Sequence, residues 1–354
     1  MEKIKVGVLG ATGIVGQYFV RLLAKHPEFE ISFLAASARS CGLSLQEATR
    51  WIIGGEMPIE VSDLFLKEAN INSIRDSGVH ILFSALPSSV AGLVEDSAAK
   101  SGIAVFSNAS AHRMRSDVPI LIPEINSSHI DLVKEQIYDR GFIVTNSNCS
   151  TSGLVFGLKP LLPFGIEEVI VTTMQSVSGA GRRGVASLDI LGNIIPYIQD
   201  EERKLETEPL KILGTKVEGK VNPAKIRIHA TCTRVPILEG HLESISVKLK
   251  EDIPVSHAVN AFSAFSGEIS PLALPTAPKK PIVLLGKEDG PQPSIDLYFQ
   301  DPLGMSVKIG RIRKQGNVIS FLLLVHNTMR GAAGASVLNA EYALRTGYLD
   351  EVVA

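Results

Sequence analysis

The sequence predicts an α/β protein with two domains: a Rossmann-type, doubly wound parallel sheet, and an α+β domain with a mainly antiparallel sheet. A glycine-rich turn separates the first apolar strand from a helix, as in a dinucleotide-binding βαβ unit. Apolar strands alternate with helical segments up to residue 148, after which strands with alternating apolar and polar residues dominate. The length of 354 residues also exceeds the ~250 to 300 residues at which single cores stop growing.

The composition indicates an ordinary globular protein, with 45% hydrophobic and 20% charged residues. The formal net charge of −2 gives no reason to expect a nucleic-acid partner. The three cysteines, Cys41, Cys149 and Cys232, are too few and too scattered for a disulfide framework. No long apolar segment suggests a signal peptide or a membrane span. We therefore expect a soluble, cytoplasmic protein.

The first strand, Ile4–Leu9, leads into a turn with three regularly spaced glycines. Gly10 allows a tight turn, Gly13 lets a pyrophosphate approach the backbone, and Gly16 lets helix and strand pack closely. The GxxGxxG spacing is less specific than GxGxxG, so the prediction of a nucleotide site depends on its position directly after the first strand.

The second strand, residues 30–36, ends in Ser37, Ala38, Arg39 and Ser40, with no acidic residue at its tip. An acidic residue there would hold the ribose 2′-hydroxyl of NAD, whereas hydroxyls and an arginine suit a 2′-phosphate. The pattern favours NADP, although Arg39 could equally be a solvated loop residue.

Two further buried strands are expected at 79–87 and 103–108, and strand ends of this kind bind ligands in doubly wound sheets. Arg113 follows the second of them and offers a planar fork of donors for an anion. A surface ion pair is the alternative reading of this arginine.

Cys149 lies in a run of small polar residues at 146–153, where a strand pattern changes into a helical one. Backbone N–H groups at the start of a helix favour a thiolate and offer donors for an oxyanion. The polar surroundings favour a nucleophile, but many free cysteines are only small buried hydrophobic residues.

The second domain should contain strands at 169–175, 226–233 and 242–249, a glycine-rich cleft loop at 177–184 and a charged helix at 200–213. Glu201, Glu202 and Lys204 on that helix could form only a solvated face. A helix of small residues opens at Asn327 and is expected to return to the first domain. The predicted domains are residues 1–148, completed by 328–354, and residues 149–327.

A thiol nucleophile needs an acid or base beside it, usually a histidine. Among eight histidines, His241 stands out because it follows Gly240 between two strands of the second domain. A structural histidine remains the alternative for this position. No cysteine or histidine spacing resembles a zinc site, so no metal is expected.

Several motifs in order along nearly the whole chain resemble the aspartate-semialdehyde dehydrogenase family, in its archaeal and fungal branch. They are Gly-Ala-Thr-Gly-Ile-Val-Gly at 10–16, Ser-Asn-Ala-Ser-Ala-His-Arg-Met at 107–114, Ser-Asn-Cys-Ser-Thr at 147–151, Met-Gln-Ser-Val-Ser-Gly-Ala-Gly at 174–181, Arg-Val-Pro at 234–236 with Gly-His at 240–241, and His-Asn-Thr-Met-Arg-Gly-Ala-Ala-Gly at 326–334. The resemblance implies NADPH-dependent reduction of L-aspartyl 4-phosphate to L-aspartate 4-semialdehyde and phosphate. It also implies a homodimer or homotetramer formed largely through the second domain.

The same resemblance implies roles for individual residues. Cys149 matches the nucleophile that carries an acyl thioester, His241 the general acid/base, and Gln175 the residue that orients the acyl group. The substrate contacts would be Arg234 and Glu201, and the phosphate contacts Arg113, Lys204 and Asn108. Glu201 and Lys204 match by a short charged pattern only. The cofactor contacts would be Gly10, Thr12, Gly13, Ile14, Val15, Ser37, Arg39, Ser40, Ser178, Gly179 and Asn327.

Three other readings stay open. Malonyl-CoA or succinyl-CoA reductases share the cysteine and histidine, but a thioester substrate needs no phosphate clamp at Arg113. N-acetyl-glutamyl-phosphate reductase is a more distant possibility. A non-catalytic NADP-binding protein would keep the glycine turn without needing Cys149 or His241.

Overall fold

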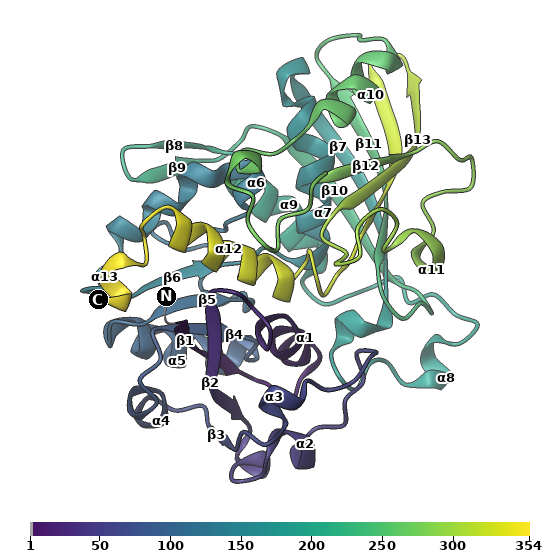
Figure 1. Cartoon of the computed structure of the whole chain (residues 1–354). Helices are drawn as coiled ribbons and strands as arrows, with labels where there is room; N and C mark the ends of the chain where they lie inside the picture. The colour runs from purple at the N-terminus through teal and green to yellow at the C-terminus, as the bar shows by residue number, and fades with distance from the viewer. Residues whose placement is uncertain (1–2) are drawn as a thin grey trace. The chain divides into compact units, whose positions relative to one another are not determined.

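The computed structural model describes residues 3–354, which form two units (Figure 1). The first unit comprises the chain up to Leu121, His129–Asn146 and Ala333–Ala354. The second comprises Ile122–Ser128 and Ser147–Ala332. Residues 122–128 belong to the second unit because Glu124 bonds there: its carboxylate accepts from Arg330 Nη2 at 2.6 Å and its carbonyl oxygen accepts from the Glu268 amide.

The first unit contains a six-stranded parallel sheet with the order β3-β2-β1-β4-β5-β6, the order of a doubly wound dinucleotide-binding fold. Its strands are β1 Ile4–Leu9, β2 Phe29–Ala36, β3 Leu66–Glu68, β4 Ile81–Ser84, β5 Ala104–Ser107 and β6 Phe142–Thr145. Its helices are α1 Ile14–Leu23, α2 Leu45–Ala48, α3 Ile59–Ser62, α4 Ile71–Asp76, α5 Ser88–Lys100, α12 Ala333–Arg345 and α13 Asp350–Val353. The predicted fold class is confirmed for this unit.

Strands β4, β5 and β6 are buried along their whole length, as expected of parallel strands that are covered on both faces. The glycine turn after β1 is built as the sequence predicts. Gly10 has a φ of +80°, which only glycine adopts easily. A Cβ atom on Gly16 would lie 2.1 Å from the Gly10 carbonyl oxygen, so helix α1 can approach the strand only with glycine there.

The second unit contains a mixed six-stranded sheet with the order β10-β7-β11-β14-β13-β12. Its strands are β7 Ile166–Gln175, β10 Arg227–Arg234, β11 His241–Leu249, β12 Ile282–Leu285, β13 Val307–Gln315 and β14 Val318–Val325, with a separate hairpin of β8 Thr215–Val217 and β9 Lys220–Asn222. Its helices are α6 Pro123–Asn126, α7 Cys149–Leu158, α8 Ser187–Ile190, α9 Glu201–Ile212, α10 Val255–Ala264 and α11 Pro293–Asp296. The pairings β7–β11, β11–β14 and β14–β13 are antiparallel, as predicted for the main part of this sheet.

One face of this sheet packs against helices and the other stays partly open. Helix α7 contacts β14, and helix α9 contacts β10. Buried and half-buried residues alternate along β11, and Ile170 on β7 is 56% exposed. The alternation therefore places one row of side chains in the core and leaves the other row accessible in the single chain.

The helix expected to open at Asn327 begins only at Ala333. The turn before it is held by His326, whose Nδ1 accepts from the amides of Thr328 and Met329. Helix α12 then belongs to the first unit. No helix within residues 3–354 is long and apolar enough to cross a membrane.

Candidate active site

Cys149 is the first residue of α7, where Asn148 caps the helix. The side-chain oxygen of Asn148 accepts hydrogen bonds from the amides of Ser150 at 3.0 Å and Thr151 at 3.2 Å. This cap stabilises the helix start by about 1 kcal/mol and holds the sulfur at its end. It also corrects the expectation that the first amides of this helix stabilise an oxyanion, because the amides of Ser150 and Thr151 already donate to Asn148.

The cap is itself fixed by α9. The Asn148 amide donates to Glu208 Oε2 at 2.6 Å, and its side-chain nitrogen donates to both carboxylate oxygens of Glu201 at 3.1 and 2.8 Å. Glu201 and Glu208 are both buried, which corrects the reading of this helix as only a solvated face. Two turns of α9 therefore set the position from which Cys149 projects.

His241 is the first residue of β11, and its ring reaches the cysteine. The distance between Cys149 Sγ and His241 Nε2 is 3.2 Å, although 92 residues separate them in sequence. Gly240, with a φ of +89°, turns the chain into the strand. The histidine has no exposed surface. The pair predicted from the sequence is therefore within hydrogen-bonding distance.

The other ring nitrogen of His241 identifies the tautomer. Nδ1 accepts a hydrogen bond from the backbone amide of Ser176 at 3.1 Å, and the Ser176 hydroxyl lies 3.3 Å away. An amide N–H can only donate, so Nδ1 carries no proton in this arrangement. The neutral ring then has its proton on Nε2 and donates it toward the sulfur.

A chain of polar groups continues behind Ser176. Its hydroxyl lies 3.1 Å from the hydroxyl of Ser178, which accepts from Asn327 Nδ2 at 2.9 Å. Asn327 Oδ1 in turn accepts from the amide of Gly240 at 2.9 Å. Ser178 and Asn327, which the family resemblance presents as cofactor contacts, thus also support His241.

The surroundings keep His241 uncharged. Burial and the nearby Arg234 guanidinium lower its pKa to about 3, although Glu201 acts in the opposite direction. At neutral pH the imidazole is therefore a neutral donor rather than an imidazolium.

Glu201 is the centre of a second group of side chains. Its carboxylate accepts from Gln175 Nε2 at 3.2 Å and from Lys204 Nζ at 2.8 Å, besides Asn148. Burial raises the pKa of Glu201, but Lys204 and the amide donors outweigh burial and lower it overall. The site therefore contains a charged carboxylate that orients Gln175 and Lys204.

Arg234, at the end of β10, is buried beside the histidine and donates from Nη1 to the Ser176 carbonyl oxygen at 2.7 Å. A Cβ atom on Gly179 would lie 2.7 Å from Arg234 Nη1 and 3.3 Å from His241 Cε1. A glycine at 179 is what allows this loop to pass so close to both side chains.

Gly331 plays a similar part beside the sulfur. A Cβ atom there would lie 2.6 Å from Cys149 Cβ and 2.4 Å from the Asn327 carbonyl oxygen. The backbone at 331 therefore fills the space directly next to the cysteine, and a larger residue would displace it.

The first unit contains most of the residues that are predicted to contact the cofactor, and two of the three predicted phosphate contacts. Helix α1 begins after Gly13 without a side-chain cap, so its first amides suit a pyrophosphate. Ser37 and Arg39 are exposed and Ser40 is half-buried around a short turn after β2, with no acidic residue among them. These donors fit a nucleotide with a 2′-phosphate.

Arg113 is buried in the loop after β5, and its Nη2 donates to the Asn108 carbonyl oxygen at 2.8 Å. Asn108 Nδ2 donates to the Ser84 carbonyl oxygen at 3.1 Å, at the end of the neighbouring strand β4. The two predicted phosphate contacts of this unit are thus held together at the carboxyl ends of adjacent strands.

Sequence reasoning missed three supporting residues: Glu208, Ser176 and Gly331. Glu208 carries a detectable signal, because it lies seven residues after Glu201 and so on the same face of α9. Ser176 acts through its backbone, and Gly331 acts through its lack of a side chain. Neither role leaves a pattern in a single sequence.

Comparisons with known proteins agree with this arrangement. Residues 5–133 match the semialdehyde dehydrogenase NAD binding domain, and residues 158–330 match the semialdehyde dehydrogenase dimerisation domain. An aspartate-semialdehyde dehydrogenase of Methanothermobacter thermautotrophicus is 47% identical over 96% of this chain and 98% of that protein. A malonyl CoA reductase (NADP) of Metallosphaera sedula is 40% identical over 98% of this chain and 99% of that protein.

Among solved structures, the aspartate semialdehyde dehydrogenase of Candida albicans with NADP superposes with a TM-score of 0.89. It is 38% identical, and the match covers 98% of this chain and 100% of that chain. The sequence similarity and the fold similarity therefore extend over both units.

Proposed function

The chain belongs to the semialdehyde dehydrogenase family, and we propose that it is an NADP-dependent aspartate-semialdehyde dehydrogenase. In the biosynthetic direction it converts L-aspartyl 4-phosphate to L-aspartate 4-semialdehyde and phosphate. The observation that carries this proposal is the 3.2 Å contact between Cys149 Sγ and His241 Nε2 at the start of α7. The semialdehyde supplies lysine, threonine, methionine and isoleucine biosynthesis.

Cys149 acts as the nucleophile of the first step. Its thiolate, which accepts from His241 Nε2, attacks the acyl carbon of the substrate. A carbon–sulfur bond forms and the carbon–oxygen bond to phosphate breaks, which leaves an acyl thioester on the cysteine. The departing phosphate takes up a proton from solvent and leaves as hydrogen phosphate.

The second step releases the aldehyde. NADPH, when bound, supplies the hydride for reduction of the thioester carbon. The Nε2–H group of His241 stabilises the alkoxide on that carbon by a hydrogen bond. Collapse of the alkoxide then breaks the carbon–sulfur bond and returns the thiolate to the same donor. In this description His241 works mainly as a neutral acid partner, since its Nδ1 already accepts from Ser176.

Substrate recognition is assigned to the charged groups around the cysteine. Arg234 binds the substrate carboxylate, Glu201 the amino group, and Gln175 orients the acyl oxygen. Arg113, Asn108 and Lys204 bind the phosphate group.

Cofactor recognition is assigned to two sets of residues. The turn after β1 binds the pyrophosphate through Gly10, Thr12, Gly13, Ile14 and Val15, and the turn after β2 binds the 2′-phosphate through Ser37, Arg39 and Ser40. In the second unit the assigned contacts are Ser178, Gly179 and Asn327. In this assignment the dinucleotide-binding domain is residues 1–148 with 328–354, and the catalytic domain is 149–327.

We assign the half-open face of the second sheet to a second copy of the chain, in a homodimer or a tetramer of such dimers. Ile170 is exposed on that face, and the hydroxyls of Ser246 and Ser320 lie 2.8 Å apart on it. The matched domain is described as a dimerisation domain. The enzyme is placed in the cytoplasm, in keeping with Cys41, Cys149 and Cys232 forming no disulfide.

The test is a steady-state assay in the reverse direction. NADP reduction should require both L-aspartate 4-semialdehyde and inorganic phosphate. Cys149→Ser should abolish turnover while NADP binding, measured by calorimetry, is retained. Unchanged function in Cys149→Ser would favour a non-catalytic NADP-binding protein instead.

Reduction of malonyl-CoA is the second candidate, because a relative with that name is 40% identical to the chain. A coenzyme A thioester makes no use of the phosphate contacts at Arg113 and Asn108. Turnover of malonyl-CoA with NADPH, without any response to phosphate, would select this alternative.

A further inference from the structure

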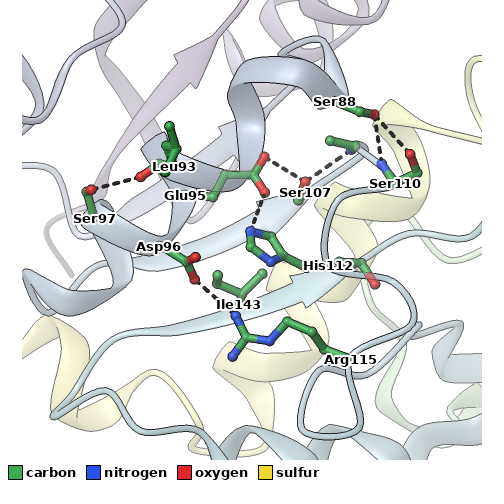
Figure 2. A network of polar contacts seen from close by, with 12 residues as sticks. Ser88, Leu93, Glu95, Asp96, Ser97, Ser107, Ser110, His112, Arg115 and Ile143 are labelled. Atoms are coloured by element: carbon green, nitrogen blue, oxygen red, sulfur yellow. Dashed lines mark hydrogen bonds and ion pairs between the residues drawn. The ribbon is translucent and has the colours of Figure 1, made fainter.

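A network of buried polar groups lies beneath the loop that follows β5 in the first unit (Figure 2). Its central residue is Glu95 on helix α5, which has no exposed surface. The reaction proposed above assigns no role to this carboxyl group, and burying it is costly unless it has partners.

Glu95 touches both ends of the loop. Glu95 Oε1 accepts a hydrogen bond from Ser107 Oγ at 2.7 Å. Ser107 Oγ in turn accepts a hydrogen bond from the backbone amide of Ala109 at 3.1 Å. Oε2 lies 3.5 Å from His112 Nε2, an electrostatic contact longer than an ordinary hydrogen bond. Figure 2 shows the carboxyl group between the two side chains.

The two proposed phosphate contacts of this unit lie directly next to the anchors Ser107 and His112. Asn108 follows Ser107 directly, and Arg113 follows His112 directly. The loop is closed by the bond from Arg113 Nη2 to the Asn108 carbonyl oxygen. A shift at either anchor therefore moves the Arg113 guanidinium group or the Asn108 side-chain amide.

We propose that Glu95 is a positioning residue for phosphate recognition: by holding Ser107 and His112 it fixes Asn108 and Arg113 in the geometry that binds the phosphate group. This inference rests on the proposed function for the identity of the ligand. The residue acts through the loop and not on the reacting atoms.

The charge of Glu95 links this arrangement to pH. Burial raises its pKa to about 7, whereas Ser84, Ser107 and the Arg113 guanidinium act in the opposite direction and Asp96 adds to the rise. Burial also lowers the pKa of His112, which favours the neutral form of its ring beside Glu95.

The remaining charged groups around the pair are two aspartates and one arginine, which together carry one negative charge. Arg115 donates to Asp96 at 3.0 Å and to Asp117 at 2.6 Å, and Tyr138 also donates to Asp96. Above neutral pH, Glu95 adds a negative charge behind Arg113. A bound phosphate dianion adds another, so phosphate binding and ionisation of Glu95 oppose each other.

The test compares wild type, Glu95→Gln and a control, Ser97→Ala. Ser97 lies on the same helix but donates to the Leu93 carbonyl oxygen, away from the loop. The KM for inorganic phosphate is measured between about pH 6 and 8.5 in the reverse reaction. Phosphate ionises in the same way in the assays of all three proteins. Differences between their plots of KM against pH therefore report on Glu95.

In wild type and Ser97→Ala the KM for phosphate should rise with pH about three- to tenfold more than in Glu95→Gln. The kcat and the KM for the semialdehyde should stay within about twofold in all three proteins. Identical pH profiles would overturn the proposal. Equal losses in kcat and in both KM values would also overturn it, because they indicate a general structural role.

A readout without turnover separates this inference from the proposed function. Inorganic phosphate should raise the Tm of wild type, with a pH dependence that Glu95→Gln flattens and Ser97→Ala retains. If no semialdehyde turnover is found but this pattern holds, the proposed function fails and the role of Glu95 stands. If turnover is found and Glu95→Gln leaves both the KM profile and the Tm profile unchanged, the proposed function stands and the role of Glu95 fails.

Discussion

The backbone amide of Ser176 donates to Nδ1 of His241 at 3.1 Å, so the neutral imidazole presents a proton on Nε2 to the sulfur of Cys149. This relationship predicts a tautomer that can be observed directly. In protein labelled with ¹⁵N-histidine, the His241 ring should show the Nε2–H form across about pH 5 to 9. Observation of the Nδ1–H form, or of an imidazolium near neutral pH, would contradict it.

The depressed pKa of His241 also predicts how stability depends on pH. The folded protein keeps the ring neutral down to about pH 3, whereas the unfolded chain binds a proton near pH 6.5. Its contribution is therefore present above about pH 6.5 and is lost as the pH falls toward 3. Between pH 8 and 5, wild type should lose on the order of 2 kcal/mol more than His241→Gln in urea unfolding. His229→Gln, at an exposed histidine, should behave like wild type.

Gly331→Ala should impair catalysis by displacing Cys149. The added methyl group would lie 2.6 Å from Cys149 Cβ, closer than two carbon atoms can pack. We expect kcat to fall at least about tenfold, because small displacements of reacting groups have large effects on rate. Gly286→Ala is the matched control, since no atom lies within 4 Å of a Cβ there. Wild-type activity in Gly331→Ala would show that the cysteine does not need its present position.

Glu201→Gln should lower kcat/KM on the order of 10- to 100-fold. Asn148, Gln175 and Lys204 all donate to this carboxylate, and a glutamine would turn its own donor toward one of them. Glu202→Gln serves as the control, because Glu202 Oε1 accepts from the Cys232 amide, and the side-chain oxygen of a glutamine can accept the same bond. Equal kcat/KM values for the two variants in steady-state kinetics would show that Glu201 does not contribute to catalysis or substrate binding.

Glu243→Met should stabilise the protein. Glu243 lies on β11 between Thr173 and Leu323 and is fully buried, and within residues 3–354 neither of its carboxyl oxygens has a hydrogen-bond partner. Burial raises its pKa well above the ordinary range, so it is held as a neutral acid. A methionine of similar volume removes the unpaired group, and the free energy of unfolding should rise by about 1 kcal/mol. The exposed Glu251→Met should change it by less than about 0.5 kcal/mol. A destabilised Glu243→Met would mean that the acid has a partner in solution.

Much of the fold follows from local patterns. The turn at Gly10 and the packing of Gly16 are properties of a few adjacent residues, and both are found as expected. The strands β7, β10 and β11 follow from their alternating residues to within a few positions. Local sequence fixes such elements because backbone angles and the burial of one face act over short distances.

The site depends on register and on chain crossings, which a single sequence does not display. His241 lies near Gln175 because β11 pairs with β7, and Arg234 lies there because β10 pairs with β7 in parallel. The family resemblance named these residues, but the support from Glu208 and from the Ser176 amide emerges only when the strands and α9 are assembled. Start positions near loops were also harder to place, as the late beginning of α12 shows.

The chain returns to the first unit at Ala333, after the main segment of the second unit. This order determines when each unit can be completed during synthesis. Helix α12 is buried in the first unit, where Glu341 bonds to His26 at 3.0 Å. During synthesis, the nucleotide-binding unit therefore stays incomplete until Ala333–Ala354 have left the ribosome, after the whole of the second unit has been made. A stop codon directly after Ala332 would remove this whole segment from the first unit and leave every residue of the second unit in place.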